Sequence, residues 1–176
     1  MAVPHARRGR ALEDLVELVL SVYEARGAAL VRRVPDPWKV VRRSGKAAEA
    51  YPAKKGLVDY LGVWRGLALA FDCKETAGRF EFGKIPEHQL QFLSGWEHCG
   101  GLAGFLVWFS RRRLLVWVPA GACLRARAAG VRSMSAEECL EAGVEVPPGV
   151  GVPFDLEAAW RCLEKGRPQI PEPPRG

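Results

Sequence analysis

Residues 67–75 constrain the fold most strongly, because an almost unbroken apolar run ends there in charged residues. Residues 67–71 read LALAF, which is typical of a strand that is buried in a sheet. Asp72 and Lys74 follow at an interval of two, so a strand directs both side chains to the same face. Burying a carboxylate and an ammonium group is costly unless a metal ion or the opposite charge compensates each of them. The segment therefore predicts a buried strand whose end carries compensated charges.

A second strand is predicted at residues 57–64, and a short Arg-Gly connection joins it to the first as a hairpin. Asp59 is expected inside this strand, from which it can converge with Asp72 and Lys74. Two carboxylates can hold Mg²⁺, and a lysine beside the ion can orient a water molecule and offset negative charge in a transition state. The spacing alone leaves an alternative open, because acid-x-lysine also occurs on the solvated faces of many strands.

The rest of the pattern alternates between helices and strands. Ser135 and Glu138 form a capping-box pattern at the start of one predicted helix, and Asp155 caps another. Helices are predicted at residues 11–26, 87–99, 135–141 and 155–165, and further strands at 28–34, 103–109 and 114–119. This order predicts one mixed α/β domain over residues 1–170, followed by a frayed, proline-rich tail at 171–176.

Residues 38–55 interrupt this pattern with a segment that has no clear periodicity. A stretch of this length inside a compact domain is usually functional or disordered. Its cations can approach phosphates, and Trp38 and Tyr51 can stack on unpaired bases. A flexible basic loop that binds any polyanion is the alternative. One acid, Glu49, stands among six basic residues: Lys39, Arg42, Arg43, Lys46, Lys54 and Lys55.

The chain as a whole is basic, with 26 Lys and Arg residues against 20 Asp and Glu residues and a formal net charge of +6. Arginine accounts for 19 of the 26 basic residues, and its planar donor fork matches phosphate. This bias favours a phosphate-rich partner. A GC-rich genome, which writes many arginine codons, is the competing explanation.

Nothing in the sequence indicates a membrane or an oxidising compartment. No apolar run approaches the roughly 18 residues of a membrane helix, and residues 1–10 lack the apolar stretch of a signal peptide. The five cysteines include no C-x-x-C pair, so neither a disulfide framework nor a zinc ribbon is predicted. We expect a soluble, cytoplasmic protein with no membrane partner.

Four motifs occur in the order that is found in one nuclease family. They are residues 8–13 (RGRALE), 58–66 (VDYLGVWRG), 71–76 (FDCKET) and 88–89 (HQ), the last preceded by Phe80 and Ile85. The RecU-type Holliday junction resolvases have R-G-x-x-L-E, T-D-Y-x-G-x-x-x-G, F-E-A-K-E-T and H-Q at similar gaps. Over residues 7–120 the chain resembles this family and, more broadly, the PD-(D/E)xK nucleases, which include the archaeal junction-resolving enzymes.

The resemblance implies a restriction-endonuclease-like α/β fold, in which helices flank a mixed central sheet and a basic stalk projects between the first two strands. It also implies an active site. Asp59 and Asp72 would be ligands of Mg²⁺, for which Mn²⁺ would substitute, and Glu13 would complete the site through the metal or its waters. Lys74 would orient the attacking water, and Gln89 would steer the nucleophile or the scissile phosphate.

Two positions depart from the family pattern. Residue 72 is Asp where Glu is usual, which shortens the side chain by one methylene, and residue 58 is Val where Thr is usual, which removes a hydroxyl group. Glu75 matches the pattern, but it points to the opposite face from Lys74. His88 ranks below Gln89, because adjacent residues on a helix face different ways. For Glu13, an ordinary exposed acid near a helix N-terminus is the alternative.

The implied substrate is a four-way DNA junction, which a Mg²⁺-dependent endonuclease would cut at two symmetry-related positions during recombination and repair. In the resembled family the stalk enters the open centre of the junction, so residues 38–55 would contact DNA. Arg7, Arg8 and Arg10 would contact backbone phosphates, with a frayed basic arm as the alternative. A junction with near two-fold symmetry that is nicked twice favours a C2 homodimer.

Recombination proteins would be further partners. Two other functions stay open: a PD-(D/E)xK nuclease with another DNA substrate, and a junction-binding protein that has lost catalysis.

Overall fold

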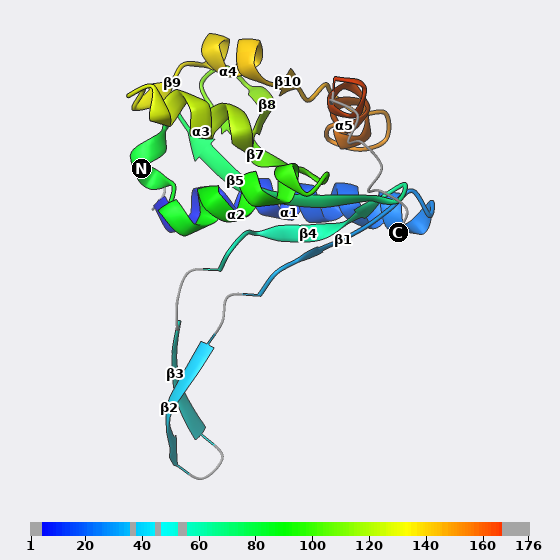
Figure 1. Cartoon of the computed structure of the whole chain (residues 1–176). Coiled ribbons are helices and arrows are strands. Elements are labelled where there is room, and N and C mark those ends of the chain that lie inside the picture. The colour runs from blue at the N-terminus through cyan, green and yellow to red at the C-terminus, as the bar shows by residue number, and fades with distance from the viewer. Residues whose placement is uncertain (1–4, 36–37, 45–46, 53–55, 167–176) are drawn as a thin grey trace, which may run out of the picture.

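The computed structural model describes residues 5–35, 38–44, 47–52 and 56–166, with side chains at 11–35 and 56–166. Six strands form one mixed sheet in the order β1-β4-β5-β7-β8-β10 (Figure 1). Their bounds are Ala29–Arg33 (β1), Tyr60–Trp64 (β4), Leu67–Thr76 (β5), Leu102–Phe109 (β7), Leu114–Pro119 (β8) and Val144–Glu145 (β10). β5 and β7 are parallel, and the other neighbouring pairs are antiparallel. This is the α/β arrangement that the sequence predicts.

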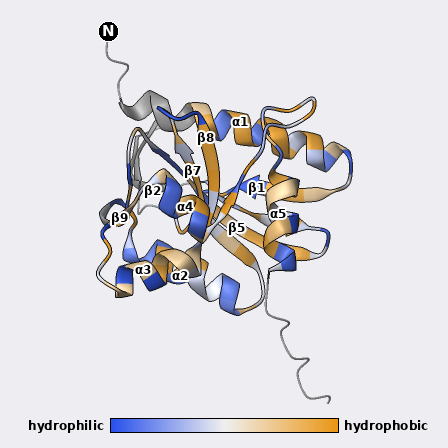
Figure 2. Ribbon diagram, turned by 90° about the horizontal axis from the view of Figure 1, so that it is seen from above, coloured by the Kyte–Doolittle hydropathy of each residue, from blue (hydrophilic) through white to orange (hydrophobic). Residues whose placement is uncertain are grey.

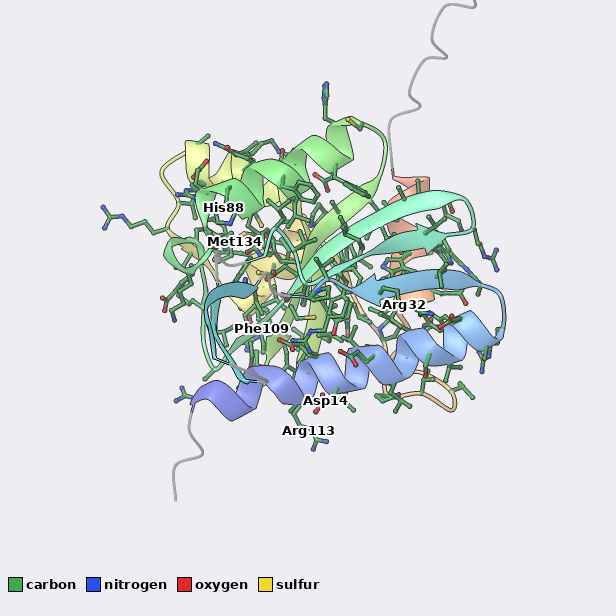
Figure 3. The ribbon with its side chains drawn as sticks, turned by 90° about the horizontal axis from the view of Figure 1, so that it is seen from below. Asp14, Arg32, His88, Phe109, Arg113 and Met134 are labelled. Atoms are coloured by element: carbon green, nitrogen blue, oxygen red, sulfur yellow. The ribbon has the colours of Figure 1, made fainter. Side chains whose placement is uncertain are left out.

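Helices cover both faces of the sheet. Their bounds are His5–Ala25 (α1), Glu87–His98 (α2), Ala120–Ala128 (α3), Ala136–Ala142 (α4) and Leu156–Lys165 (α5). One buried cluster joins α1 and α5 to the sheet, and a second joins α2, α3 and α4 to it. Figure 3 shows α1 and α2, in blue and green, on opposite sides of the strands, and Figure 2 shows hydrophobic residues along β7 and β8 between the layers.

The hairpin of β4 and β5 is formed as the sequence predicts. Arg65 and Gly66 connect the strands, and their φ angles of 48° and 83° are the positive values that a tight two-residue hairpin turn requires. On the other side of β4, β1 approaches so closely that a Cβ atom at Gly62 would lie 2.2 Å from the carbonyl oxygen of Leu30. Glycine at position 62 therefore lets β1 pair with the strand that follows Asp59.

The periodicity of β5 decides which layer its charged residues face. Leu69 and Phe71 belong to the cluster under α1, whereas Ala70 belongs to the cluster under α2. Because side chains alternate along a strand, Asp72 continues the row of Ala70 and faces the α2 layer. Cys73 continues the row of Phe71 and packs against the α1 cluster.

Residues 38–52 form two strands, Trp38–Ser44 (β2) and Ala47–Pro52 (β3), that the sequence pattern does not reveal. They pair antiparallel as a sheet of their own, with an irregular register between Val40 and Arg42. Figure 1 shows this pair extending away from the six-stranded sheet. Regular alternation of apolar and polar residues marks a strand with one buried face, and residues 38–52 do not show it.

The C-terminal third completes both cores. The capping box of Ser135 and Glu138 opens α4, and the Asp155 side chain accepts a hydrogen bond from the Ala158 N–H at the start of α5, as the sequence predicts. Trp160 on α5 is fully buried and contacts three aromatic rings, those of Tyr23, Trp64 and Trp117.

The structure adds α3 and several short elements: Phe80–Glu81 (β6), Phe82–Lys84 (η1) and Ser133–Met134 (β9), with β6 and β9 paired. The expected tail at 171–176 lies outside the described residues. None of the helices in the described part of the chain is long and apolar enough to cross a membrane.

Candidate active site

Asp59 lies immediately before β4, where the sequence predicts it inside the strand. Its carbonyl oxygen accepts a hydrogen bond from the Val34 N–H at 2.8 Å, which continues the pairing of β1 with this segment. Its carboxylate oxygen Oδ2 accepts from the backbone N–H of Cys73, also at 2.8 Å. The Asp59 side chain thus accepts a β5 N–H group that a backbone carbonyl would accept in a regular sheet. Regular pairing of β4 with β5 accordingly stops at Tyr60 and Phe71. This bond holds Asp59 beside the residue that follows Asp72.

Asp72 is 1% exposed, and two side chains hold its carboxylate. Gln89, which is buried on the first turn of α2, donates from Nε2 to Oδ1. The ammonium group of Lys74 forms an ion pair with Oδ2. Lys74 also donates to Oε1 of Gln89 at 3.3 Å. The three side chains thus form a closed set of contacts between β5 and α2.

The Asp72 carboxyl group is difficult to ionise in this position. Burial, and to a lesser extent the neighbouring charge of Asp59, raise the pKa of Asp72 to about 7, even though the Lys74 ammonium opposes both effects. Two carboxylates that approach each other in a dry site repel, so one of them retains a proton near neutral pH unless a cation joins them. This electrostatic state is typical of a site that binds a divalent metal ion.

Glu13 reaches the same end of the sheet from α1. The hydroxyl group of Tyr60 donates to the backbone carbonyl of Glu13 at 3.3 Å, and the Glu13 carboxylate forms an ion pair with Arg33, the last residue of β1. Burial raises the pKa of Glu13, Arg33 lowers it, and the charge of Asp59 raises it. The neighbouring Asp14 is exposed on the outer side of α1 (Figure 3). Of these two consecutive acids, only Glu13 faces the strands.

The donor set suits a divalent metal ion. In the described residues, the buried oxygens Oε2 of Glu13 and Oδ2 of Asp72 receive no well-directed hydrogen bond, although each faces a cation, Arg33 or Lys74. Carboxylate oxygens are the ligands that Mg²⁺ and Mn²⁺ prefer. Across the same part of the chain, no group of three or more His, Cys, Asp or Glu side chains is already arranged to hold a metal ion.

The family model for RecU, recombination protein U, matches residues 7–158. The chain belongs to the RecU family. This confirms the family that the motifs indicate, and the match extends beyond residue 120, where the motif resemblance ends.

Several curated bacterial proteins are similar to this RecU-family chain, and each is named Holliday junction resolvase RecU. The protein of Leuconostoc mesenteroides is 29% identical over 169 residues, which cover 90% of this chain and 83% of the relative. The protein of Leuconostoc citreum is 28% identical over 174 residues, covering 93% and 85%. The protein of Geobacillus kaustophilus is 32% identical over 117 residues, covering 62% and 58%.

The remaining candidates in the RecU motifs lie away from the carboxylates. His88 is exposed on α2, one residue from the buried Gln89 (Figure 3). Glu75 faces the other side of the sheet, where it lines a cavity of about 610 Å³ together with Leu12, Trp108 and Phe154. These positions agree with the lower rank that the sequence gives to both residues.

The predicted DNA contacts are only partly described. The backbone at Arg7, Arg8 and Arg10 is helical, because α1 begins at His5 rather than at residue 11. Three other cations lie on β2, namely Lys39, Arg42 and Arg43. The side chains of these six residues lie outside the described part of the structure, as do Lys46, Lys54 and Lys55 altogether.

Arg33 and Tyr60 are the residues at this site that sequence reasoning missed. Tyr60 belongs to the RecU motif at residues 58–66, but its hydroxyl group reaches α1, which no local pattern indicates. Arg33 belongs to none of the four motifs and ends a predicted strand beside a turn signal. The sequence offers one signal for this pairing. Arg33 is a basic residue at the end of the first predicted strand, and the helix before that strand carries two acids one turn apart, Glu13 and Glu17.

Proposed function

We propose that this protein is a structure-selective endonuclease that resolves four-way Holliday junctions in DNA recombination and repair. Membership of the RecU family and the names of its relatives support this function. The main structural observation behind it is the buried carboxyl group of Asp72, held by Lys74 and Gln89 beside Asp59. A buried acid that is costly to ionise destabilises a fold, so its presence at the end of a strand indicates a functional site.

Mg²⁺ is the proposed cofactor, and Mn²⁺ would substitute for it. Asp59 and Asp72 would hold the ion, and Glu13 would complete the site directly or through water, since Mg²⁺ usually keeps several water ligands. When bound, the ion would supply Lewis-acid polarisation of the phosphate and a lowered pKa for a nearby water. Two acids that repel each other in the protein alone would then be held in their ionised form.

The protein's own groups would position the reaction. The side chain of Lys74 is a quarter exposed, so its ammonium group could donate to a water or a phosphate oxygen while it stays beside Asp72. It would orient the attacking water and offset the charge that develops on the phosphate. Gln89 would hold the side chains of Asp72 and Lys74 in position, because it donates a hydrogen bond to Asp72 and accepts one from Lys74. The expected products carry 5′-phosphate ends, as in the family.

DNA recognition would depend on shape and phosphate position. Arg7, Arg8 and Arg10 near the start of α1 would contact backbone phosphates. The β2–β3 hairpin, with Lys39, Arg42, Arg43, Lys46 and the adjacent Lys54 and Lys55, would enter the centre of the junction as a basic stalk. Such binding releases counterions, so it would weaken steeply as salt rises.

The active form would be a homodimer. Residues 1–170 of each subunit would form one nuclease domain. Two cuts at symmetry-related positions require two active sites, and a C2 dimer supplies them in matching orientation. Recombination proteins would be further partners, and the protein would act on junction DNA in the cytoplasm.

The test compares cleavage of a four-way junction, a flap and a linear duplex of the same sequence in Mg²⁺. We expect the junction to be cut much faster than the other two. Equal rates on all three would assign a general nuclease of the PD-(D/E)xK class. Tight junction binding without any cutting would assign a binding protein that has lost catalysis.

A further inference from the structure

Arg33 bridges two acids on α1. Its guanidinium group forms an ion pair with the Glu13 carboxylate, and Nη1 lies 3.3 Å from Oε1 of Glu17. Residues four apart on a helix project from the same side, so one arginine fork can hold both. Arg33 is 44% exposed and Glu17 is 48% exposed, whereas Glu13 is only 18% exposed. The bridge therefore runs from the protein surface to a carboxylate of the candidate active site.

Each of two carboxylates at this site already has a cation. Lys74 forms an ion pair with Asp72 on the α2 side of the sheet, and Arg33 forms one with Glu13 on the α1 side. Lys74 belongs to the acid-x-lysine motif and has its own role beside the substrate. Arg33 has no such role in the proposed reaction, and it contacts the oxygen of Glu13 that lacks any well-directed hydrogen bond within the described residues.

Arg33 is fixed at the edge of the site by its backbone. It ends β1, where its Cα is paired with that of Tyr60, and the next residue, Val34, donates its N–H to the carbonyl of Asp59. Its long side chain can move, but strand pairing keeps its Cα opposite Tyr60, the residue that follows Asp59. A metal ion shared by Asp59 and Glu13 would therefore lie close to the guanidinium group, and the two cations would repel.

We propose that Arg33 is a built-in counter-ion that neutralises Glu13 in the metal-free protein and competes with the divalent cation for it. The inference rests on the proposed metal-dependent function, and it adds a residue that sets the metal affinity of the site. Arg33 acts through Glu13, so it is a positioning residue. The consequence is that the DNA-free protein holds its metal ion more weakly than the carboxylates alone would.

The test measures Mg²⁺ and Mn²⁺ affinity of the full-length, DNA-free protein by titration calorimetry. Arg33→Gln removes the charge, and Arg33→Lys keeps it. Arg32→Gln is the matched control, because Arg32 lies on the same strand and pairs with Glu24 instead (Figure 3). A unit charge and a divalent ion about 6 Å apart repel, even in bulk water, by enough to change an affinity about tenfold. We expect Arg33→Gln to bind metal about tenfold more tightly, and Arg33→Lys and Arg32→Gln to bind like the wild type.

A second background separates this role from a general change of charge. In Glu13→Gln protein, the further change Arg33→Gln should raise metal affinity by clearly less than it does in the wild type, since no Glu13 carboxylate then holds the guanidinium group beside the metal ion. Unchanged or weaker metal binding by Arg33→Gln alone would overturn the proposal, and so would an equal gain in the Glu13→Gln background or in Arg32→Gln. The titration needs no DNA, so absent junction cleavage would refute the proposed function without deciding this inference.

Discussion

Replacing Asp72 by Asn should stabilise the metal-free protein at neutral and alkaline pH. The pKa of Asp72 rises from its ordinary value of 3.8 to about 7, chiefly through burial and then through the charge of Asp59. The folded-state pKa is above the unfolded one, so the stability that the neutral carboxyl group provides is complete below about pH 4. It is lost as pH rises through 7, where the folded protein must ionise the group.

The size of the effect follows from that shift. One pKa unit corresponds to about 1.4 kcal/mol, so ionising Asp72 in the folded protein costs at most about 4 kcal/mol. Lys74 and Gln89 can adjust around the charge, which reduces the penalty. We expect Asp72→Asn to gain about 1–3 kcal/mol of unfolding free energy at pH 8, and close to nothing at pH 4.

Urea denaturation with EDTA at both pH values measures this difference. Asp14→Asn is the control, because Asp14 is an exposed acid next to Glu13 on α1 and should change stability by less than about 0.5 kcal/mol. Adding Mg²⁺ at pH 8 should stabilise the wild type and leave Asp72→Asn unaffected, since only an intact site binds the ion. A variant that is less stable than the wild type at pH 8 in EDTA, or a gain that does not depend on pH, would refute the reasoning.

Three further changes test other parts of the structure. Lys74→Met should abolish junction cutting and leave junction affinity within a few-fold in a gel-shift assay, because binding depends on many other cations; retained cutting would remove Lys74 from the reaction. Deleting residues 39–54 should spare duplex affinity and abolish junction resolution, and surviving resolution would show that the hairpin is dispensable. Ser135→Ala should cost about 1 kcal/mol in thermal unfolding through loss of the capping box with Glu138; no loss of stability would mean that packing alone holds α4.

The centre of the fold could be predicted because its signals are local. The apolar run before Asp72 marks a buried strand, and the two-residue interval to Lys74 is enough to place both side chains on one face. The Arg65-Gly66 connection specifies the hairpin in the same way. Side-chain alternation is a property of any strand, so these predictions need no knowledge of what packs against them.

Elements without a local signal were missed. Helix α3 reads AGACLRARA, and small residues bury its contact face without any large apolar repeat. The sequence of the β2–β3 pair lacks the alternation of apolar and polar residues by which a strand with one buried face is predicted. The sequence predicts Asp59 inside the strand, whereas β4 begins one residue later, at Tyr60. Regular pairing is interrupted there because the Asp59 side chain, rather than a backbone carbonyl, accepts the Cys73 N–H.

The site could be predicted only as far as its motifs extend. The family resemblance nominates Glu13 and Gln89, but their contacts depend on how α1 and α2 pack on opposite faces of the sheet. Arg33 is further removed, because its pairing with Glu13 joins the first strand to the first helix across the sheet edge. Such contacts between distant elements are set by tertiary packing, which no short pattern encodes.

Mapping the cuts on a four-way junction with a fixed crossover tests the central claim most directly. Each strand would be labelled in turn, and the products would be incubated with DNA ligase after digestion in Mg²⁺. The account predicts two nicks at symmetry-related positions, 5′-phosphate ends and duplex products that ligate without further processing. Cuts in one strand only, cuts scattered along the arms, or ends that ligase cannot join would contradict it.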